Sequence, residues 1–424
     1  MAMAKEASTF FDLSNENVET PGLKPLELEI EDSPAEKMPS KNPFLRYRHF
    51  YQVDYRRQRK KLFILGILIF DVCLFLAARF FLSKPNFYYF GRMIIFLALG
   101  AYFHLFAFLL IFFLIERVSN LLIRRTPKFY ILQSKTLHTV IAIGLALFLT
   151  LQGFISTLQR PTIKNLNLSI QNLPAEFENF TIALVSDIHT GPTVGRSRVE
   201  EIVEIVNQLD ADVVTIAGDL VDGYVDYIGD RVLPIKNLKS KYGTFIALGN
   251  HEYIHENVDH WIKFFGSNLN ATVLVNSGTV LKKDGKELCI AGVDDYFAET
   301  AQIEGHKMDT EKALSSCPSS VSTTILLVHQ PNGVAKVLTT LKKINKKVDL
   351  ILSGHTHAGQ MYIVWPVGYL VNHFFYGLYI YPESGTQIYV SSGVNFWGPP
   401  IKMLPSLCEI VKIRLHKAPN SSLA

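Results

Sequence analysis

The stretch TIALVSDIH, residues 181–189, joins a short apolar run to two polar side chains. Residues 181–186 are mostly aliphatic or β-branched, which predicts a short buried strand. Asp187 and His189 follow at once, and their spacing of two points both side chains the same way off the strand end. Residues 198–209 then carry Val and Ile at helical spacing. A buried strand that leads through a polar tip to a helix predicts an α/β domain.

Four further apolar runs end in the same kind of polar tip. They lie at 213–217, 244–248, 324–328 and 348–352. The tips that follow them are Gly218-Asp219, Gly249-Asn250-His251-Glu252, His329, and Gly354-His355-Thr356-His357. Ligands of α/β sheets bind beyond the carboxyl ends of the strands, so we expect these tips to form one site. Apolar runs at 288–293, 387–391 and 407–415 predict a second sheet.

Asp, Asn and His at five strand ends indicate a metal centre, because packing alone would favour apolar residues there. Hydrolysis of a phosphoester gains from two divalent cations about 3.5–4 Å apart. Such a pair needs a bridging carboxylate, and we assign this place to Asp219. Asn250 offers a neutral oxygen, while His251 is free to protonate the leaving oxygen or to bind the phosphoryl group. Mixed nitrogen and oxygen ligands suit Mn, Fe or Zn better than Ca.

In this order the five tips resemble the motifs of the calcineurin-like metallophosphoesterase superfamily, D-x-H, G-D-x-x-D, G-N-H-E, H and G-H-x-H. The resemblance covers residues 178–415. It implies an α/β/β/α sandwich of two mixed sheets and a metal-dependent phosphoric ester hydrolase.

The resemblance also implies roles for individual residues. It implies one metal held by Asp187, His189, Asp219 and His357, and a second held by Asp219, Asn250, His329 and His355, with His251 catalytic. Asp222 and Glu252 are expected to orient neighbouring ligands, and a purely structural role such as helix capping is equally open for them.

The longer block SGHTHAGQ, residues 353–360, and the aromatic stretch 362–381 resemble the YkuE-type subgroup. Together with the long apolar runs within residues 62–158, the chain resembles transmembrane proteins with a metallophosphoesterase domain. Ala358 departs from the usual glycine of the subgroup. Lys402 stands where arginine is expected, which puts a bidentate phosphate contact there in question. The aromatic stretch is an acyl-binding wall, a surface at the bilayer interface or an ordinary packed insert, and its His373 is expected to be structural.

Three apolar runs, at 62–82, 93–115 and 137–158, are long enough to cross a bilayer, which takes about 20 residues. The first contains Asp71 and Arg79. Arg79 lies near an end of the run and can reach the interface, whereas Asp71 is costly at mid-membrane unless it is protonated or paired. The predicted division is a disordered acidic leader with a basic juxtamembrane segment (1–61), three spans (62–158), a linker (159–177), the catalytic domain (178–415) and a tail (416–424).

The formal charge of +4 averages unlike parts. Residues 1–40 carry three basic and nine acidic side chains, 41–61 eight and one, and 62–158 eight and two. Basic residues beside apolar runs favour a membrane over nucleic acid as partner. They cluster before the first run and between the second and third, which predicts a cytoplasmic N-terminus and a lumenal or extracellular catalytic domain. A glycosylation sequon at Asn167, just beyond the third run, agrees with this orientation, although such sequons are common by chance, and Asn270 begins another.

The four cysteines show no CxxC spacing of a zinc knuckle. Cys289, Cys317 and Cys408 lie in the domain expected outside, where one pair could be oxidised. Their spacing does not identify the pair.

The sequence therefore predicts a membrane-anchored dinuclear-metal enzyme that hydrolyses a phosphomonoester or phosphodiester, with a lipid-linked substrate as one option. Two alternatives stay open. A protein phosphatase would share the metal core, and a catalytically silent membrane receptor or scaffold would bind well below two ions per chain.

Overall fold

The computed structural model describes residues 89–122, 130–255 and 257–419, together with six positions between 65 and 76. The leader and basic segment predicted for 1–61, most of the first predicted span (62–82) and the end of the predicted tail lie outside the described residues. The chain divides into two compact units, Met1–Val72 and Cys73–Ala424. All helices and strands described below belong to the second unit.

Two helices, α3 (Tyr89–Leu122) and α5 (Lys135–Leu158), are long and apolar enough to cross a membrane. They contain the second and third predicted spans, and the short α4 (Tyr130–Gln133) lies between them. The two long helices contact each other. His104 Nδ1 on α3 lies 3.1 Å from Thr150 Oγ1 on α5, and Lys135 Nζ lies 3.2 Å from Glu116 Oε1. These polar pairs link two otherwise apolar helices.

Residues 399–403 contact both helices through a feature that we name the glycine socket, formed by Gly100, Gly153 and Ile401. A Cβ added at Gly100 would lie 2.2 Å from Ile401 Cδ1, and one added at Gly153 would lie 2.4 Å from Ile401 Cγ2. The N–H of Lys402 donates to the carbonyl of Gly153 at 3.0 Å. Only glycine leaves room for Ile401 here, so the socket holds this segment against α3 and α5.

We expect Gly153→Ala to destabilise the full chain by about 1–3 kcal/mol relative to Gly144→Ala, because the added methyl overpacks the socket. Gly144 lies on the same helix and has no atom within 4 Å of an added Cβ, so it controls for the helix propensity of alanine. Thermal unfolding of the detergent-solubilised chain measures both variants. Adding Ile401→Ala should recover part of the loss. Equal melting temperatures of the two alanine variants would show that Ile401 does not pack tightly against Gly153.

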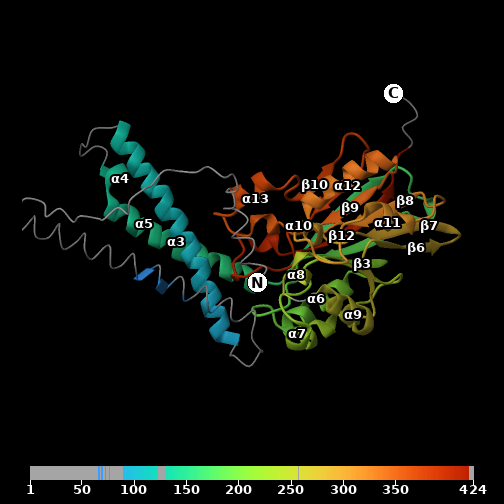
Figure 1. Cartoon of the computed structure of the whole chain (residues 1–424), viewed down its shortest axis with the longest axis horizontal. Coiled ribbons are helices and arrows are strands. Elements are labelled where there is room, and N and C mark those ends of the chain that lie inside the picture. Colours follow the sequence, from blue (N-terminus) through green and yellow to red (C-terminus); the bar gives the residue numbers. More distant parts are fainter. Residues whose placement is uncertain are drawn as a thin grey trace, which may run out of the picture. The chain divides into compact units, whose positions relative to one another are not determined.

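The residues after α5 form two six-stranded sheets (Figure 1). The first has the order β1 (Thr162–Ile170), β12 (Glu409–Lys417), β2 (Thr181–Val185), β3 (Val213–Ala217), β4 (Thr244–Ala247) and β5 (Thr272–Leu274). The second has the order β10 (Gly377–Ile380), β11 (Gln387–Val390), β9 (Leu350–Ser353), β8 (Thr323–Leu327), β7 (Lys286–Gly292) and β6 (Ser277–Lys283). Each sheet contains parallel and antiparallel pairs, so both are mixed.

Helices lie outside the two sheets. The longer ones are α6 (Arg196–Gln208), α7 (Val225–Val232), α9 (Val258–Asn268) and α12 (Pro331–Ile344). Shorter helices are α8 (Asn250–Ile254), α10 (Tyr296–Thr300), α11 (Thr310–Ser315) and α13 (Trp365–Val371), with 3₁₀ turns η2 (Ala175–Phe177), η3 (Leu233–Asn237), η4 (His357–Gly359) and η5 (Pro405–Leu407).

Buried hydrophobic side chains form three clusters between the layers. Leu184, Ile325 and Tyr389 belong to the core between the sheets. Val206 of α6 and Trp261 of α9 pack in a second core on the first sheet, and α12 closes a third on the second sheet. This arrangement confirms the predicted α/β/β/α sandwich.

Strand β1 lies within the segment that the sequence predicts to be a linker, 159–177. It pairs in parallel with β12 along its whole length, from Thr162 opposite Glu409 to Ile170 opposite Lys417. Only three residues separate the end of α5 at Leu158 from this strand. The sheet therefore begins directly after the apolar helix.

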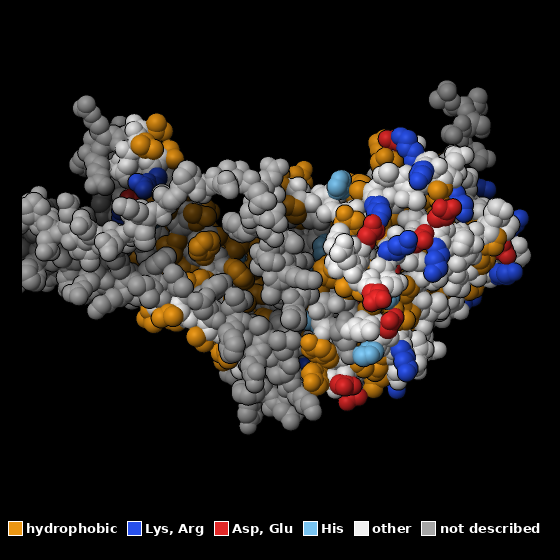
Figure 2. Space-filling model, in the orientation of Figure 1, with side chains coloured by type: hydrophobic (Ala, Val, Ile, Leu, Met, Phe, Trp, Pro, Cys, Tyr) orange, Lys and Arg blue, Asp and Glu red, His pale blue; other side chains and the backbone are white. Residues whose placement is uncertain are grey.

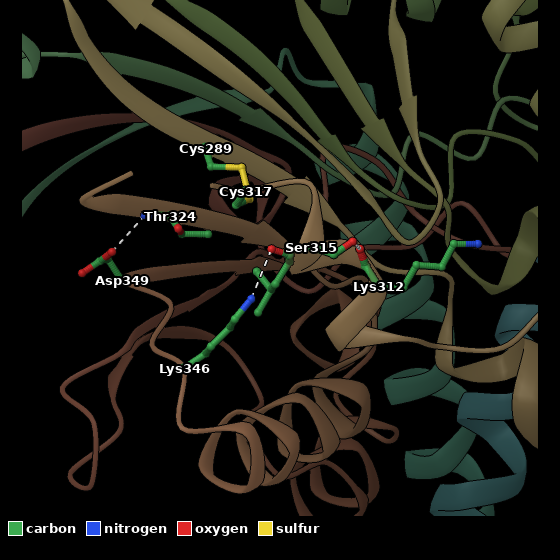
Figure 3. The surroundings of a disulfide bond; sticks show 8 residues. Cys289, Lys312, Ser315, Cys317, Thr324, Lys346 and Asp349 are labelled. Atoms are coloured by element: carbon green, nitrogen blue, oxygen red, sulfur yellow. Dashed lines mark hydrogen bonds between the residues drawn. A yellow bond between two sulfur atoms is a disulfide. The ribbon is translucent and has the colours of Figure 1, made fainter. Parts of the chain in front are cut away.

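A disulfide joins Cys289 on β7 to Cys317, which lies between α11 and β8 (Figure 3). Around it, the hydroxyl of Ser315 donates to the carbonyl of Lys312 at 2.7 Å, and the N–H of Thr324 donates to Asp349 Oδ2 at 2.9 Å. Cys408 is buried and free. Of the pairs that the sequence left open, the structure forms Cys289–Cys317.

Candidate metal centre

Strand ends from both sheets meet at one place. Asp187 and His189 follow β2, Asp219 follows β3, and Asn250 and His251 open α8 directly after β4. From the second sheet, His329 follows β8, and His355 and His357 follow β9. His189 Nε2 lies 2.9 Å from His357 Nε2, which joins the two sheets at this point. The structure thus brings together every metal ligand predicted from the sequence, with His251 beside them.

Five of the predicted ligands have left-handed backbone conformations. The φ angles are 56° at Asp187, 51° at His189, 52° at Asp219, 72° at His355 and 51° at His357. For residues with a Cβ this conformation costs about 1–2 kcal/mol. Such strain gathers at functional sites because it aims side chains that a regular strand would point elsewhere.

The first ligand group consists of Asp187, His189 and His357, whose ligand atoms lie within 4.8 Å of one another. Asp187 Oδ1 lies 3.4 Å from His357 Nε2 and 4.0 Å from His189 Nε2. The hydroxyl of Ser186 and the N–H of His355 both donate to Asp187. These donors fix a carboxylate that is completely buried.

The second group consists of Asp219, His329 and His355. His329 Nδ1 donates to the carbonyl of Ala217 at 2.7 Å, which leaves the lone pair on Nε2. That Nε2 is buried without a hydrogen-bond partner among the described residues and lies 3.1 Å from Asp219 Oδ2. Asn250 Oδ1 lies 2.9 Å from His355 Nδ1. A buried imidazole nitrogen aimed at a carboxylate fits a divalent cation between them.

Asp219 belongs to the second group and also faces His189 of the first. Its Oδ2 is 3.7 Å from His189 Nε2, 3.1 Å from His329 Nε2 and 4.0 Å from His251 Nε2. The N–H of His251 donates to Oδ1 at 2.9 Å. One carboxylate therefore reaches ligands of both groups, as a bridging residue requires.

Asp222 orients two of the site's histidines. Its Oδ1 lies 2.9 Å from His189 Nδ1 and 2.6 Å from His251 Nδ1. Because each ring uses Nδ1 for this contact, each Nε2 is directed toward Asp219.

Glu252 binds backbone N–H groups, whereas Asp222 contacts histidine rings. Its carboxylate accepts N–H bonds from Gly249 at 2.6 Å, Leu220 at 2.8 Å, and Asp219 and Val221 at 3.2 Å. Burial and the nearby Asp219 raise its pKa to about 8, and the bond from Gly249 acts in the opposite direction. Glu252 thereby holds the loops after β3 and β4 together.

Burial also controls the charge of the ligands. Together with His329, burial lowers the pKa of His355 to about 3. Burial and Lys402 hold the pKa of His357 well below its usual range. Burial raises the pKa of Asp222, but His189 and His251 outweigh it and bring that pKa below the ordinary range. Neutral imidazole is the form that binds metal. At His189 and His329 burial also lowers the pKa, but the neighbouring carboxylates outweigh it and raise the pKa of both rings.

Glycines in the predicted motifs allow close approach of the backbone. A Cβ at Gly249 would lie 2.2 Å from Asp219 Oδ1, and one at Gly354 would lie 1.9 Å from Ser186 Oγ. The motif glycines are therefore required by packing around the ligands.

Lys402 lies beneath the site instead of facing it. Its side chain is completely buried, and Nζ donates to the carbonyls of Ser392 at 2.5 Å and Asn395 at 3.0 Å, with His357 Nδ1 at 3.4 Å. Its ammonium thus supports a predicted metal ligand, a role that residue type alone does not reveal. Ala358 has a φ of 50°, the conformation that the usual glycine of the subgroup adopts most easily.

Trp397 and His373 differ in their surroundings. The ring of Trp397 lies 6.0 Å from the ring of His251, centroid to centroid, and sequence reasoning did not identify it because no motif contains it. His373 is exposed, and its Nδ1 lies 2.9 Å from Asn332 Oδ1.

Several known proteins are similar in sequence to this chain. Residues 180–359 match the family described as calcineurin-like phosphoesterase. The chain is 37% identical over 410 residues to a Caenorhabditis elegans protein named as a metallophosphoesterase, F40B5.2, covering 96% of this chain and 83% of that one. It is 36% identical over 327 residues to the transmembrane protein with metallophosphoesterase domain of Danio rerio, covering 76% and 73%. It is 27% identical over 241 residues to the uncharacterized metallophosphoesterase YkuE of Bacillus subtilis, covering 55% and 78%.

Proposed function

The chain belongs to the calcineurin-like phosphoesterase family of metal-dependent hydrolases, and we propose that it is a membrane-anchored phosphomonoesterase or phosphodiesterase with two divalent cations. The observation that carries the proposal is the position of Asp219 between two groups of buried ligands. In the proposed assignment, Asp187, His189 and His357 hold one cation and Asn250, His329 and His355 hold the other, with Asp219 shared. Mn, Fe and Zn suit these ligands.

The proposed reaction needs water activation, charge neutralisation and a proton for the leaving oxygen. Two bound cations would supply the first two by lowering the pKa of water and by neutralising phosphoryl oxygens. His251 supplies the third, since its Nδ1 lies 2.6 Å from Asp222 Oδ1 and its Nε2 lies 4.0 Å from the shared carboxylate. Proton transfer by a positioned histidine contributes about 10²–10⁴-fold to a rate.

Hydrolysis of bis-p-nitrophenyl phosphate by the full chain in detergent micelles tests this proposal. We expect release of p-nitrophenolate that depends on added Mn, Fe or Zn and stops with a chelator. The exposed Asp226→Asn variant, on α7, should match the wild type. Absence of hydrolysis of this diester with all three metals would refute the proposed phosphodiesterase activity.

We further propose that the substrate is lipid-linked. Support comes from the three residues that separate α5 from the catalytic sheet and from Trp397 beside His251. A dodecyl p-nitrophenyl phosphodiester should then have at least about a tenfold higher kcat/KM than its methyl analogue, because burial of each CH₂ is worth about 0.8 kcal/mol. Equal values for the two esters would refute the lipid preference.

For topology we propose three spans, a cytoplasmic N-terminus and a lumenal or extracellular catalytic domain. Two observations support this orientation. Cys289 and Cys317 form a disulfide, which is typical of oxidising compartments. Asn167 on the edge strand β1 and Asn270 are both exposed, as glycosylation requires.

We expect the disulfide to be closed in intact membranes. Cys289 and Cys317 should resist alkylation until a reductant is added, and the Cys289→Ala, Cys317→Ala variant should be destabilised by roughly 3–4 kcal/mol for a loop of this length. Mass spectrometry of alkylated peptides and thermal unfolding measure these effects. Reductant should lower the melting temperature of the wild type and leave that of the double variant unchanged. Ready alkylation of both thiols in native vesicles would contradict the proposed orientation.

A further inference from the structure

An exposed apolar surface lies next to the metal centre. We name it the apolar rim and define it by Trp365, Val367, Tyr369, Leu370 and Val371 of α13 together with Trp397. Leu370 is 79% exposed, Val371 61% and Tyr369 59%, and α13 has no buried residue. In the described part of the chain after residue 158, Ile163 is the one exposed large hydrophobic residue outside 362–404. Such a concentration marks an interaction site.

The apolar rim is tied to the helices that are long enough to span a membrane. Gln360 joins the two parts of the rim, because its Nε2 donates to the carbonyl of Trp397 at 2.8 Å and its Oε1 accepts the N–H of Trp397 at 2.8 Å. The carbonyl of Gln360 accepts the N–H of Met403 at 2.8 Å. Residues 399–403 in turn fill the glycine socket. The rim and the socket are therefore connected in one hydrogen-bonded frame.

This frame places the rim near the end of the candidate span. Gly153, which contacts Ile401, lies five residues before the end of α5 at Leu158. At 1.5 Å per residue, the contact of residues 399–403 with α5 lies roughly 8 Å along the helix axis from the C-terminal end of α5. Trp and Tyr are enriched at membrane–water interfaces, so the rim, which is connected to residues 399–403, carries the side chains expected near the end of a span.

The rim also adjoins the catalytic residues. Helix α13 contacts η4, which carries His357, and the ring of Trp397 meets the ring of His251 edge to face. No residue of α13, WPVGYLV, is charged. By contrast, Figure 2 shows Lys, Arg, Asp and Glu side chains spread over the visible face of the catalytic domain.

We propose that the apolar rim is a bilayer-docking surface, in which α13 and Trp397 insert into the leaflet at the C-terminal end of α5. The occupant is lipid because the rim continues from the glycine socket of α3 and α5, and because its side chains are those of a membrane interface. Docking holds the metal centre close to the bilayer surface. It goes beyond the proposed hydrolytic function and does not depend on it.

Tryptophan quenching by lipid tests the docking. The chain has three tryptophans, of which Trp261 is completely buried and Trp365 and Trp397 are 46% and 43% exposed. The full chain is reconstituted into phosphatidylcholine vesicles brominated at shallow acyl positions. We expect roughly twofold quenching of the wild type, since two of three tryptophans face lipid, and almost none in the Trp365→Phe, Trp397→Phe variant. Unquenched wild-type emission, as when a second copy of the chain covers the rim, overturns the proposal.

A second experiment introduces a charge into the apolar rim. Leu370→Glu should remove at least half of the quenching in the Trp397→Phe background, where Trp365 is the remaining exposed tryptophan. Ser267→Glu, at an exposed position on α9, is the matched control and should leave it unchanged. An equal effect of both substitutions overturns the docking. In the otherwise wild-type chain, Leu370→Glu and Ser267→Glu should hydrolyse the soluble diester at the same rate. Absence of hydrolysis in every variant would count against the proposed function while the quenching result stands.

Discussion

Asp219→Asn should lower kcat/KM for bis-p-nitrophenyl phosphate by roughly 10³-fold, because loss of the shared carboxylate removes several kcal/mol of metal-based stabilisation and each 1.36 kcal/mol is tenfold. The substitution keeps the size of the side chain and its Oδ1, which accepts the N–H of His251. The fold should therefore persist, while the second oxygen, which faces His189 and His329, is replaced by an uncharged amide nitrogen.

Initial rates at saturating Mn, with circular dichroism of the same samples, separate loss of chemistry from loss of fold. Asp226→Asn removes a carboxylate from the exposed face of α7 and is the matched control. A loss below about tenfold for Asp219→Asn, less than one hydrogen bond to a charged group is worth, would mean that Asp219 does not bridge two cations.

The second large effect is expected for His251→Ala, and its size should depend on the leaving group. A p-nitrophenolate leaves with little help, so the loss should be on the order of tenfold, whereas an alkoxide needs the proton and should show a loss of about 10²–10⁴-fold. The dependence follows because His251 is buried between Asp222 and Asp219 and directs Nε2 toward the site.

Rates for bis-p-nitrophenyl phosphate and for an alkyl phosphodiester, measured on the same enzyme samples, give this comparison. His373→Ala serves as the control because His373 is exposed and bonded to Asn332, outside the ligand groups. An equal loss of His251→Ala on both esters would assign His251 to phosphoryl binding instead of proton donation, the alternative that the sequence leaves open.

Much of the site could be predicted because its signal is local. Each ligand directly follows an apolar run that is long enough for one strand, and parallel strands bring such ends together. Asp187 and Asp219 could therefore be placed at one sheet edge without knowledge of the fold, whereas His329 follows a strand of the second sheet. The strands themselves agree with the structure to within about two residues, as the coincidence of 213–217 with β3 illustrates.

Other features depend on contacts between distant residues. Strand β1 reads as a linker because its partner β12 lies at the far end of the domain. The left-handed φ angles at His355 and His357 belong to the turn that follows β9 in the second sheet, and residue type does not encode them. Lys402 supports His357 only because Ser392 and Asn395 turn their carbonyls toward its ammonium.

The most direct test of the dinuclear centre is the metal content of the purified full chain. After saturation with Mn and removal of free ions, inductively coupled plasma mass spectrometry should find two ions per wild-type chain and about one or fewer in Asp219→Asn. A wild-type content well below two ions per chain, unchanged by the substitution, would contradict the account and favour a catalytically silent membrane protein.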